Sequence, residues 1–99
     1  MALPVNTMVK QNKVGAIKMK KIIRFTAEWC QPCKTLSKQL ETMDLNMPID
    51  VIDIDKDPEI AIEYGIRSVP TLVLMEDNEV KSKIVGLKAP NEIREWATA

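Results

Sequence analysis

The sequence predicts an α/β domain built on a mixed four-stranded sheet flanked by helices. From Met19 onward, strand-like and helix-like segments alternate along the chain. A parallel strand–helix–strand unit comes first, and an antiparallel pair of strands followed by a helix comes second. The 99 residues, of which 45% are hydrophobic, suffice for one modest core.

The first strand runs directly into a helix. Residues 21–27, KIIRFTA, are β-branched and aromatic, as is typical of a strand. Pro32 suits the first turn of a helix, because the backbone N–H that proline lacks has no helical partner there. Behind it, apolar residues recur every three or four positions and predict one buried helix face, formed by Cys33, Leu36, Leu40 and Met43.

The second strand is predicted at residues 48–55, PIDVIDID. Its adjacent Val51 and Ile52 suggest a strand that is buried on both faces. Residues 57–65, DPEIAIEYG, predict a short helix with three boundary signals. These are an N-cap, a first-turn proline and a terminating glycine, at Asp57, Pro58 and Gly65.

The remaining elements are a hairpin and a helix. Residues 70–75, PTLVLM, and 79–85, EVKSKIV, predict two antiparallel strands joined by the tight polar link EDN. Residues 89–99 predict the last helix, with one apolar face formed by Ile93, Trp96 and Ala97. We therefore expect one domain over residues 19–99. Residues 1–18 fit the pattern less well, and we expect an N-terminal extension that forms either an extra strand or an added arm.

The bulk properties argue against several function classes. Formal net charge is zero, so no overall field favours nucleic acid. No apolar run approaches the ~18 residues of a membrane span, and the N-terminus lacks the basic-then-apolar order of a signal peptide. We therefore expect a monomeric cytoplasmic protein that binds neither nucleic acid nor membranes. In that reducing compartment, a purely structural disulfide is disfavoured.

Both cysteines of the chain, Cys30 and Cys33, lie in the segment WCQPCK. A structural zinc site needs about four thiolate or imidazole ligands, whereas this chain has two cysteines and no histidine. A metal shared between two chains stays open as an alternative. Haem attachment would require a histidine where Lys34 stands. A dithiol at a strand–helix junction is typical of disulfide exchange, so we predict a redox-active pair and no metal site.

The positions of the two cysteines predict different roles. The thiolate is the nucleophile in exchange, and a helix N-terminus favours it. Cys30 is expected at that helix end and near the surface, where it would attack a substrate disulfide. Cys33, one turn further on, lies on the apolar face and is expected to resolve the mixed disulfide that forms.

Two segments resemble the thioredoxin family. FTAEWCQPCK is similar to the active-site segment of that family, and YGIRSVPTLVLM is similar to its second signature, which carries a cis-proline loop. The similarity continues through NEVKSKIVG and extends from Ile22 to Trp96. It implies the thioredoxin fold and reduction of protein disulfides. It also implies no bound cofactor, because electrons come from an external thioredoxin-reductase-type donor.

The resemblance also implies roles for individual residues around the cysteines. Cys30 becomes the attacking and Cys33 the resolving cysteine. Trp29 matches the family tryptophan beside the active site, although an ordinary core indole is the alternative. Pro32 matches the proline that tunes the redox potential, and initiating the helix is compatible with that role.

Three further residues match the substrate groove of the family. Pro70 matches the cis-proline that faces the disulfide, whereas the residues alone leave a trans bond open. Val69 would offer its backbone groups to an extended substrate segment. Gly86 matches the glycine that opens the same groove, and a plain turn glycine is the alternative.

The sequence departs from the family at three positions in and around the active site. Gln31 stands where the family usually has glycine, so the usual strongly reducing potential cannot be assumed. Arg24 stands where the family keeps a buried aspartate, and Val51 replaces the lysine partner of that aspartate. A positive charge near Cys33 would favour thiolates and hence the reduced form. Alternatively, Arg24 extends to the sheet edge or pairs with Asp53.

Two other functions remain as alternatives to protein-disulfide reduction. One is a glutaredoxin-like reaction coupled to glutathione. The other is a docking module that keeps the fold without catalysis, which the retained dithiol argues against, since docking needs no cysteine pair.

Overall fold

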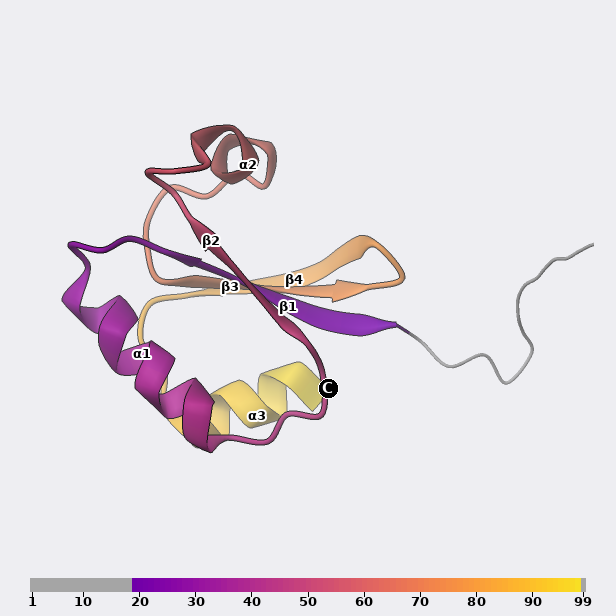
Figure 1. Cartoon of the computed structure of the whole chain (residues 1–99). Coiled ribbons are helices and arrows are strands. Elements are labelled where there is room, and N and C mark those ends of the chain that lie inside the picture. Colours follow the sequence, from indigo (N-terminus) through magenta and orange to yellow (C-terminus); the bar gives the residue numbers. More distant parts are fainter. Residues whose placement is uncertain (1–18, 99) are drawn as a thin grey trace, which may run out of the picture.

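Figure 1 shows the chain as a computed structural model, which describes residues 19–98. The prediction of an N-terminal extension falls on residues 1–18 and lies outside the described residues. The elements follow the predicted order: β1 (Lys20–Thr26), α1 (Gln31–Thr42), β2 (Ile49–Asp53), α2 (Pro58–Glu63), β3 (Thr71–Glu76), β4 (Glu79–Val85) and α3 (Pro90–Thr98).

The strands form one four-stranded sheet in the order β2-β1-β3-β4. β1 is parallel to β2 and antiparallel to β3, and β3 is antiparallel to β4. The hairpin between β3 and β4 turns at Asp77 and Asn78, whose φ angles of 55° and 69° are both left-handed. The predicted mixed sheet, a parallel unit followed by an antiparallel hairpin, is therefore confirmed.

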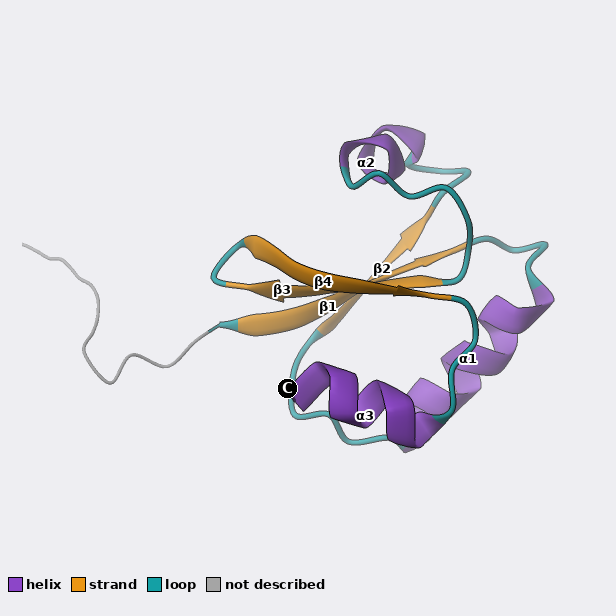
Figure 2. Ribbon diagram, turned by 180° about the vertical axis from the view of Figure 1, so that it is seen from behind, coloured by secondary structure: helices purple, strands orange, loops and turns teal. Residues whose placement is uncertain are grey.

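The helices cover both faces of the sheet, with α1 and α3 on one face and α2 on the other (Figures 1 and 2). Alternate residues of the central strands separate into two cores. The core beneath α1 and α3 is formed by Ile22, Leu36, Leu40, Leu45, Leu72, Leu74, Ile93 and Ala97. The core beneath α2 is formed by Ile23, Phe25, Ala61, Val73 and Met75.

The predicted apolar face of α1 is confirmed, because its buried residues are Cys33, Leu36 and Leu40. Met43 caps the C-terminal end of this helix and packs against the same core. The apolar face thus holds α1 at a fixed distance above β1, and its first turn carries Cys33 to the end of the strand.

The prediction that β2 is buried on both faces is wrong. β2 is an edge strand, and the side chain of Val51 is 53% exposed. Ile52 is half-buried and packs against the core beneath α2. On the opposite face, α1 presents Ser37 and Glu41 toward Val51, and these polar residues line a hollow instead of covering the strand.

The boundary residues of α2 follow the sequence prediction in part. Asp57 occupies the N-cap position, but its side chain makes no capping hydrogen bond. Its carbonyl instead accepts the N–H of Ile60 at 3.2 Å. Gly65 follows Tyr64, the C-cap residue of the helix, and has a φ of +68°, a left-handed conformation that glycine adopts without strain. Within residues 19–98, no helix is long and apolar enough to cross a membrane.

Candidate active site

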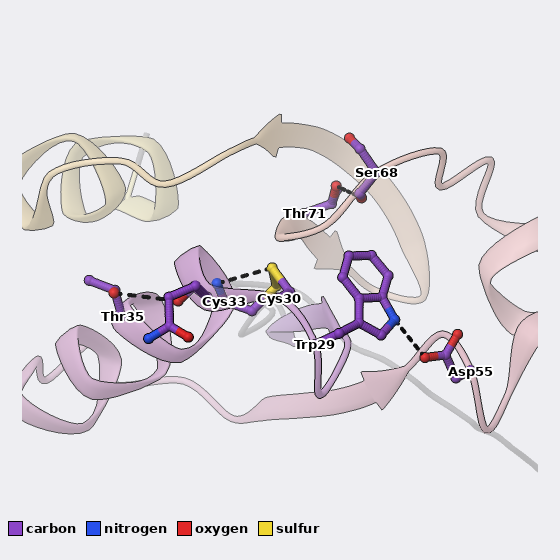
Figure 3. The surroundings of a disulfide bond; sticks show 8 residues. Trp29, Cys30, Cys33, Thr35, Asp55, Ser68 and Thr71 are labelled. Atoms are coloured by element: carbon purple, nitrogen blue, oxygen red, sulfur yellow. Dashed lines mark hydrogen bonds between the residues drawn. A yellow bond between two sulfur atoms is a disulfide. The ribbon is translucent and has the colours of Figure 1, made fainter.

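The cysteine pair lies where β1 ends and α1 begins. Cys30 is the N-cap residue of α1, and its N–H donates to the carbonyl of Ala27 at 3.2 Å, which turns the chain after the strand. Cys30 and Cys33 form a disulfide with their Cα atoms 5.2 Å apart. The N–H of Cys33 donates to Sγ of Cys30 at 3.2 Å (Figure 3). A helix N–H aimed at this sulfur would also stabilise it as a thiolate.

Both cysteines are buried in this disulfide form. Cys33 is 1% exposed, as expected for the apolar face of α1, but Cys30 is only 4% exposed, which differs from the surface position that we expected. The pair packs with Ala27, and two half-buried side chains, Ile54 and Val69, cover this small cluster. The burial of Cys30 follows from the bond itself, because a side chain that bonds Cys33 must turn toward the core.

The indole of Trp29 lies beside the disulfide and is not a core residue. Its side chain is 68% exposed, and its Nε1–H donates to Oδ2 of Asp55 at 2.8 Å (Figure 3). The alternative of an ordinary core indole is therefore wrong. Sequence analysis missed Asp55. The parallel pairing of β1 with β2 is the signal that could have found it, because the carboxyl ends of parallel strands meet at one edge of the sheet.

The two residues between the cysteines are exposed on the first turn of α1. Pro32 lies in that turn, which confirms its helix-initiating position. Gln31 is the first residue of the helix, and its carbonyl accepts the hydroxyl of Thr35 at 3.5 Å. Both side chains therefore lie on the surface next to the buried sulfur atoms.

A second segment, the loop that precedes β3, approaches the disulfide from the other side. The peptide bond between Val69 and Pro70 is cis, so the trans alternative is wrong. The hydroxyl of Thr71 donates to the carbonyl of Ser68 at 2.8 Å and closes the loop across this bond (Figure 3). The N–H of Gly86 donates to the carbonyl of Pro70 at 2.8 Å and joins the loop to the end of β4.

Val69 and Gly86 lie at the two ends of the loop contact around Pro70, and each has a feature suited to substrate binding. The side chain of Val69 packs against the cysteine pair. Its backbone N–H and carbonyl make no hydrogen bond to any other residue of the range 19–98. Gly86 has a φ of +92°, and apart from its chain neighbours no atom of residues 19–98 lies within 4 Å of the place where a Cβ would stand. This glycine is therefore required by its backbone conformation, and it also borders open space.

Comparison with known proteins identifies the family of this arrangement. The family model for thioredoxin matches residues 4–99 of the chain. The chain belongs to the thioredoxin family. The thioredoxin of Rickettsia bellii is 42% identical over 79 residues, which cover 76% of this chain and 75% of that protein. The thioredoxin of Bacillus subtilis is 40% identical over 75 residues and 72% of each chain.

Solved structures give the same result for the fold. A mutant thioredoxin of Halobacterium salinarum superposes with a TM-score of 0.76 at 33% identity, over 80% of this chain and 72% of that one. Mitochondrial thioredoxin 3 of Saccharomyces cerevisiae, in its oxidized form, superposes with a TM-score of 0.73 at 30% identity, over 81% and 77% of the two chains. The chain is therefore a protein thiol–disulfide oxidoreductase, and its mixed four-stranded sheet has the thioredoxin fold.

The site also contains an arginine, Arg24, that lines one cavity together with Cys33. Arg24 points from β1 toward the α1 face of the sheet and pairs in register with Val51 of β2. It lines a cavity of about 240 Å³ together with Cys33 and Asp53. No ion pair joins Arg24 to Asp53 in the described part of the chain, so the predicted pairing of these two residues is wrong.

Arg24 as a whole residue is half-buried rather than fully solvated. Burial lowers the pKa of Arg24 from its ordinary value, and the nearby carboxylate of Glu41 acts in the opposite direction. Arg24 also lines the hollow beside Val51, so its side chain extends to the sheet edge. One positive charge therefore lies between the sheet edge and the cavity wall that Cys33 forms.

Proposed function

We propose that Cys30 attacks the substrate disulfide and that Cys33 resolves the mixed disulfide. The observation that carries this assignment is the hydrogen bond of 3.2 Å from the N–H of Cys33 to Sγ of Cys30. It stabilises negative charge on the sulfur at the helix end, whereas Cys33 is 1% exposed on the apolar face of α1. Charge stabilisation therefore favours Cys30 as the nucleophile, although both cysteines are buried in the disulfide form, and Cys33 is left for the intramolecular step.

The reaction then follows two exchanges. The thiolate of Cys30 attacks one sulfur of the substrate disulfide, so that a bond from Cys30 to the substrate forms and one substrate thiolate leaves. The thiolate of Cys33 next attacks Sγ of Cys30, which forms the intramolecular disulfide and releases the second substrate thiolate. The substrate gains two electrons and the protein loses two.

The substrate segment would bind in extended form beside the loop of Val69. The backbone N–H and carbonyl of Val69 bond to no other residue of the range 19–98, so they are suited to accept a strand from the substrate. Val69 precedes Pro70 and packs against the cysteine cluster, and the open space at Gly86 would admit the substrate chain. Trp29, with its exposed indole fixed by Asp55, would form the opposite wall.

The oxidised protein needs an external electron source, because the chain itself supplies only the dithiol. We propose a reductase of the thioredoxin-reductase type, which donates two electrons to the disulfide while two protons are taken from solvent. Protein disulfides are the proposed substrates, and no bound cofactor is required.

We place the reaction in the cytoplasm, with the protein as a monomer. Both of its cysteines belong to the exchange pair, which leaves no structural disulfide to require an oxidising compartment.

Insulin reduction with three alternative donors tests this proposal. The donors are dithiothreitol, NADPH with thioredoxin reductase, and glutathione with glutathione reductase. We expect reduction with the first two and little with glutathione. Reduction that is driven best by glutathione would favour the glutaredoxin-like alternative. Failure with all three donors would contradict the proposal and favour a docking module.

A further inference from the structure

The cavity behind the disulfide contains a charge arrangement that the exchange mechanism above does not use. Arg24 of β1 and Cys33 of α1 form part of the wall of one cavity of about 240 Å³. Cys33 lines this hollow but is only 1% exposed, so its side chain is shielded from bulk water. Any charge in the cavity therefore acts on Cys33 more strongly than on a solvated thiol.

We propose that Arg24 is a positioning residue that stabilises the thiolate of Cys33 and thereby favours the reduced form of the protein. This inference rests on the proposed exchange function, because it concerns the same cysteine pair. The oxidised form has no charge on either sulfur. A positive charge nearby therefore stabilises only the reduced form, and only when a thiol has ionised.

The other charged groups that line the cavity act on Cys33 less than Arg24 does. Glu28 precedes α1, Lys34 lies in its first turns, and both are exposed, so solvent screens them. Asp53 of β2 is half-buried, but its Oδ1 accepts the N–H groups of Asp55 and Lys56 at 2.8 and 3.3 Å. Its carboxylate is therefore oriented toward its own loop.

Arg24 differs from these groups in two respects. It is half-buried, and within residues 19–98 no carboxylate lies within ion-pair distance of its guanidinium. The nearest acidic influence comes from Glu41, an exposed residue of α1 in the adjoining hollow. Because a carboxylate at ion-pair distance would cancel most of its field, the absence of one leaves the positive charge of Arg24 effective across the cavity.

The positive charge of Arg24 favours the reduced form at equilibrium, and it also assists the step in which Cys33 resolves the mixed disulfide. Cys33 must lose its thiol proton before its sulfur attacks Sγ of Cys30, and the proton passes to water at the exposed side of the cavity near Glu28. With Arg24 present, the thiolate of Cys33 is formed at lower pH.

The equilibrium with glutathione measures this preference for the reduced form. In that reaction two glutathione molecules lose two electrons and become one disulfide, and the protein disulfide becomes two thiols.

The test is the equilibrium constant of the purified full chain with glutathione, measured across pH for the wild type and for Arg24→Met. Below the pKa of both thiols the two proteins should be equal. Above them, the fraction reduced should favour the wild type by a factor that rises to about three- to tenfold in the equilibrium constant. This range corresponds to about 15 to 30 mV for a two-electron couple.

Matched variants distinguish charge from structure. Arg94→Met removes the same charge from an exposed position of α3 that lines neither cavity, and the equilibrium should not change. Arg24→Lys should retain most of the wild-type behaviour. Glu41→Gln, an exposed substitution that does not threaten folding, should shift the equilibrium in the direction opposite to Arg24→Met.

A direct measurement uses the ultraviolet absorbance of the thiolate in Cys30→Ser, with and without Arg24→Met. Removal of the arginine should raise the pKa of Cys33. An unchanged pKa, or a difference in equilibrium that does not vary with pH, would overturn the inference. Insulin reduction is measured separately. If the protein does not reduce insulin but Arg24→Met still changes the glutathione equilibrium as expected, the proposed function is contradicted and the inference about Arg24 is not.

Discussion

The N–H of Cys33 donates to Sγ of Cys30 at 3.2 Å, across the first turn of the same helix. This relationship arises because Cys30 is the N-cap residue of α1 and its sulfur occupies the place of a capping oxygen. The buried apolar face of α1 in turn holds this helix end against the sheet. Fold and chemistry are therefore connected through one helix terminus.

The first prediction concerns the ionisation of Cys30 in the reduced protein. The helix N-terminus should lower the pKa of Cys30 below the ~8.5 of a free cysteine. The rate of alkylation by iodoacetamide, measured against pH in Cys33→Ser, reports this value, because that substitution keeps the backbone N–H. A half-maximal rate at or above ~8.5 would show that the hydrogen bond does not stabilise the thiolate.

The second prediction concerns the indole of Trp29. Asp55→Ala removes the hydrogen bond of 2.8 Å that orients this exposed ring. We expect insulin reduction to slow about threefold, the kinetic equivalent of roughly 0.65 kcal/mol for one ordinary hydrogen bond. The free energy of unfolding should change by about 1 kcal/mol or less, since both groups are exposed.

Trp96→Phe provides the matched control for that prediction. It removes the hydrogen bond from Nε1 of Trp96 to the hydroxyl of Ser82 at 2.6 Å, on α3 and β4. This variant should keep its activity while losing stability. Equal activities of Asp55→Ala and the wild type in the insulin assay would contradict a role for the oriented indole.

The third prediction concerns the open space at Gly86. Gly86→Ala should cost about 1 to 2 kcal/mol of stability, because a φ of +92° is unfavourable for residues with a side chain. The added methyl group points into space that we assign to the substrate, so the KM for insulin should rise about tenfold.

Gly65→Ala separates these two effects. Gly65 also has a positive φ, +68°, and an added Cβ would meet only Nζ of Lys83 at 3.5 Å, an ordinary contact. Urea unfolding should give a similar loss of stability for the two variants, and the KM for insulin should rise in Gly86→Ala alone. A normal KM in Gly86→Ala would place the substrate elsewhere.

Most of the fold was predictable from local patterns. The spacing of Leu36 and Leu40 fixed the buried face of α1, and the polar link at Asp77 and Asn78 fixed the hairpin. Helix faces and tight turns are determined by residues that are close together in the chain, so their patterns can be recognised in the sequence alone. The burial of Val51 was predicted wrongly because it depends on strand order and on which side chains α1 presents across the sheet.

The active site was predictable where one residue type carries the chemistry. Cys30 and Cys33 were identified from their spacing, but the depth of Cys30 follows from the disulfide, which turns its sulfur inward. The hydrogen bond from Trp29 to Asp55 joins two strand ends that are far apart in the sequence. Such pairs become visible only when the parallel register is known.

The most direct test of the account is a trapping measurement on Cys33→Ser. The reduced variant is mixed with a protein disulfide, the free thiols are blocked, and the products are separated by mass spectrometry. We predict a covalent complex joined through Cys30, which accumulates because no second thiol resolves it, whereas Cys30→Ser gives no complex and no insulin reduction. A complex joined through Cys33 in Cys30→Ser, or equal inertness of both variants toward disulfides, would contradict the assigned roles.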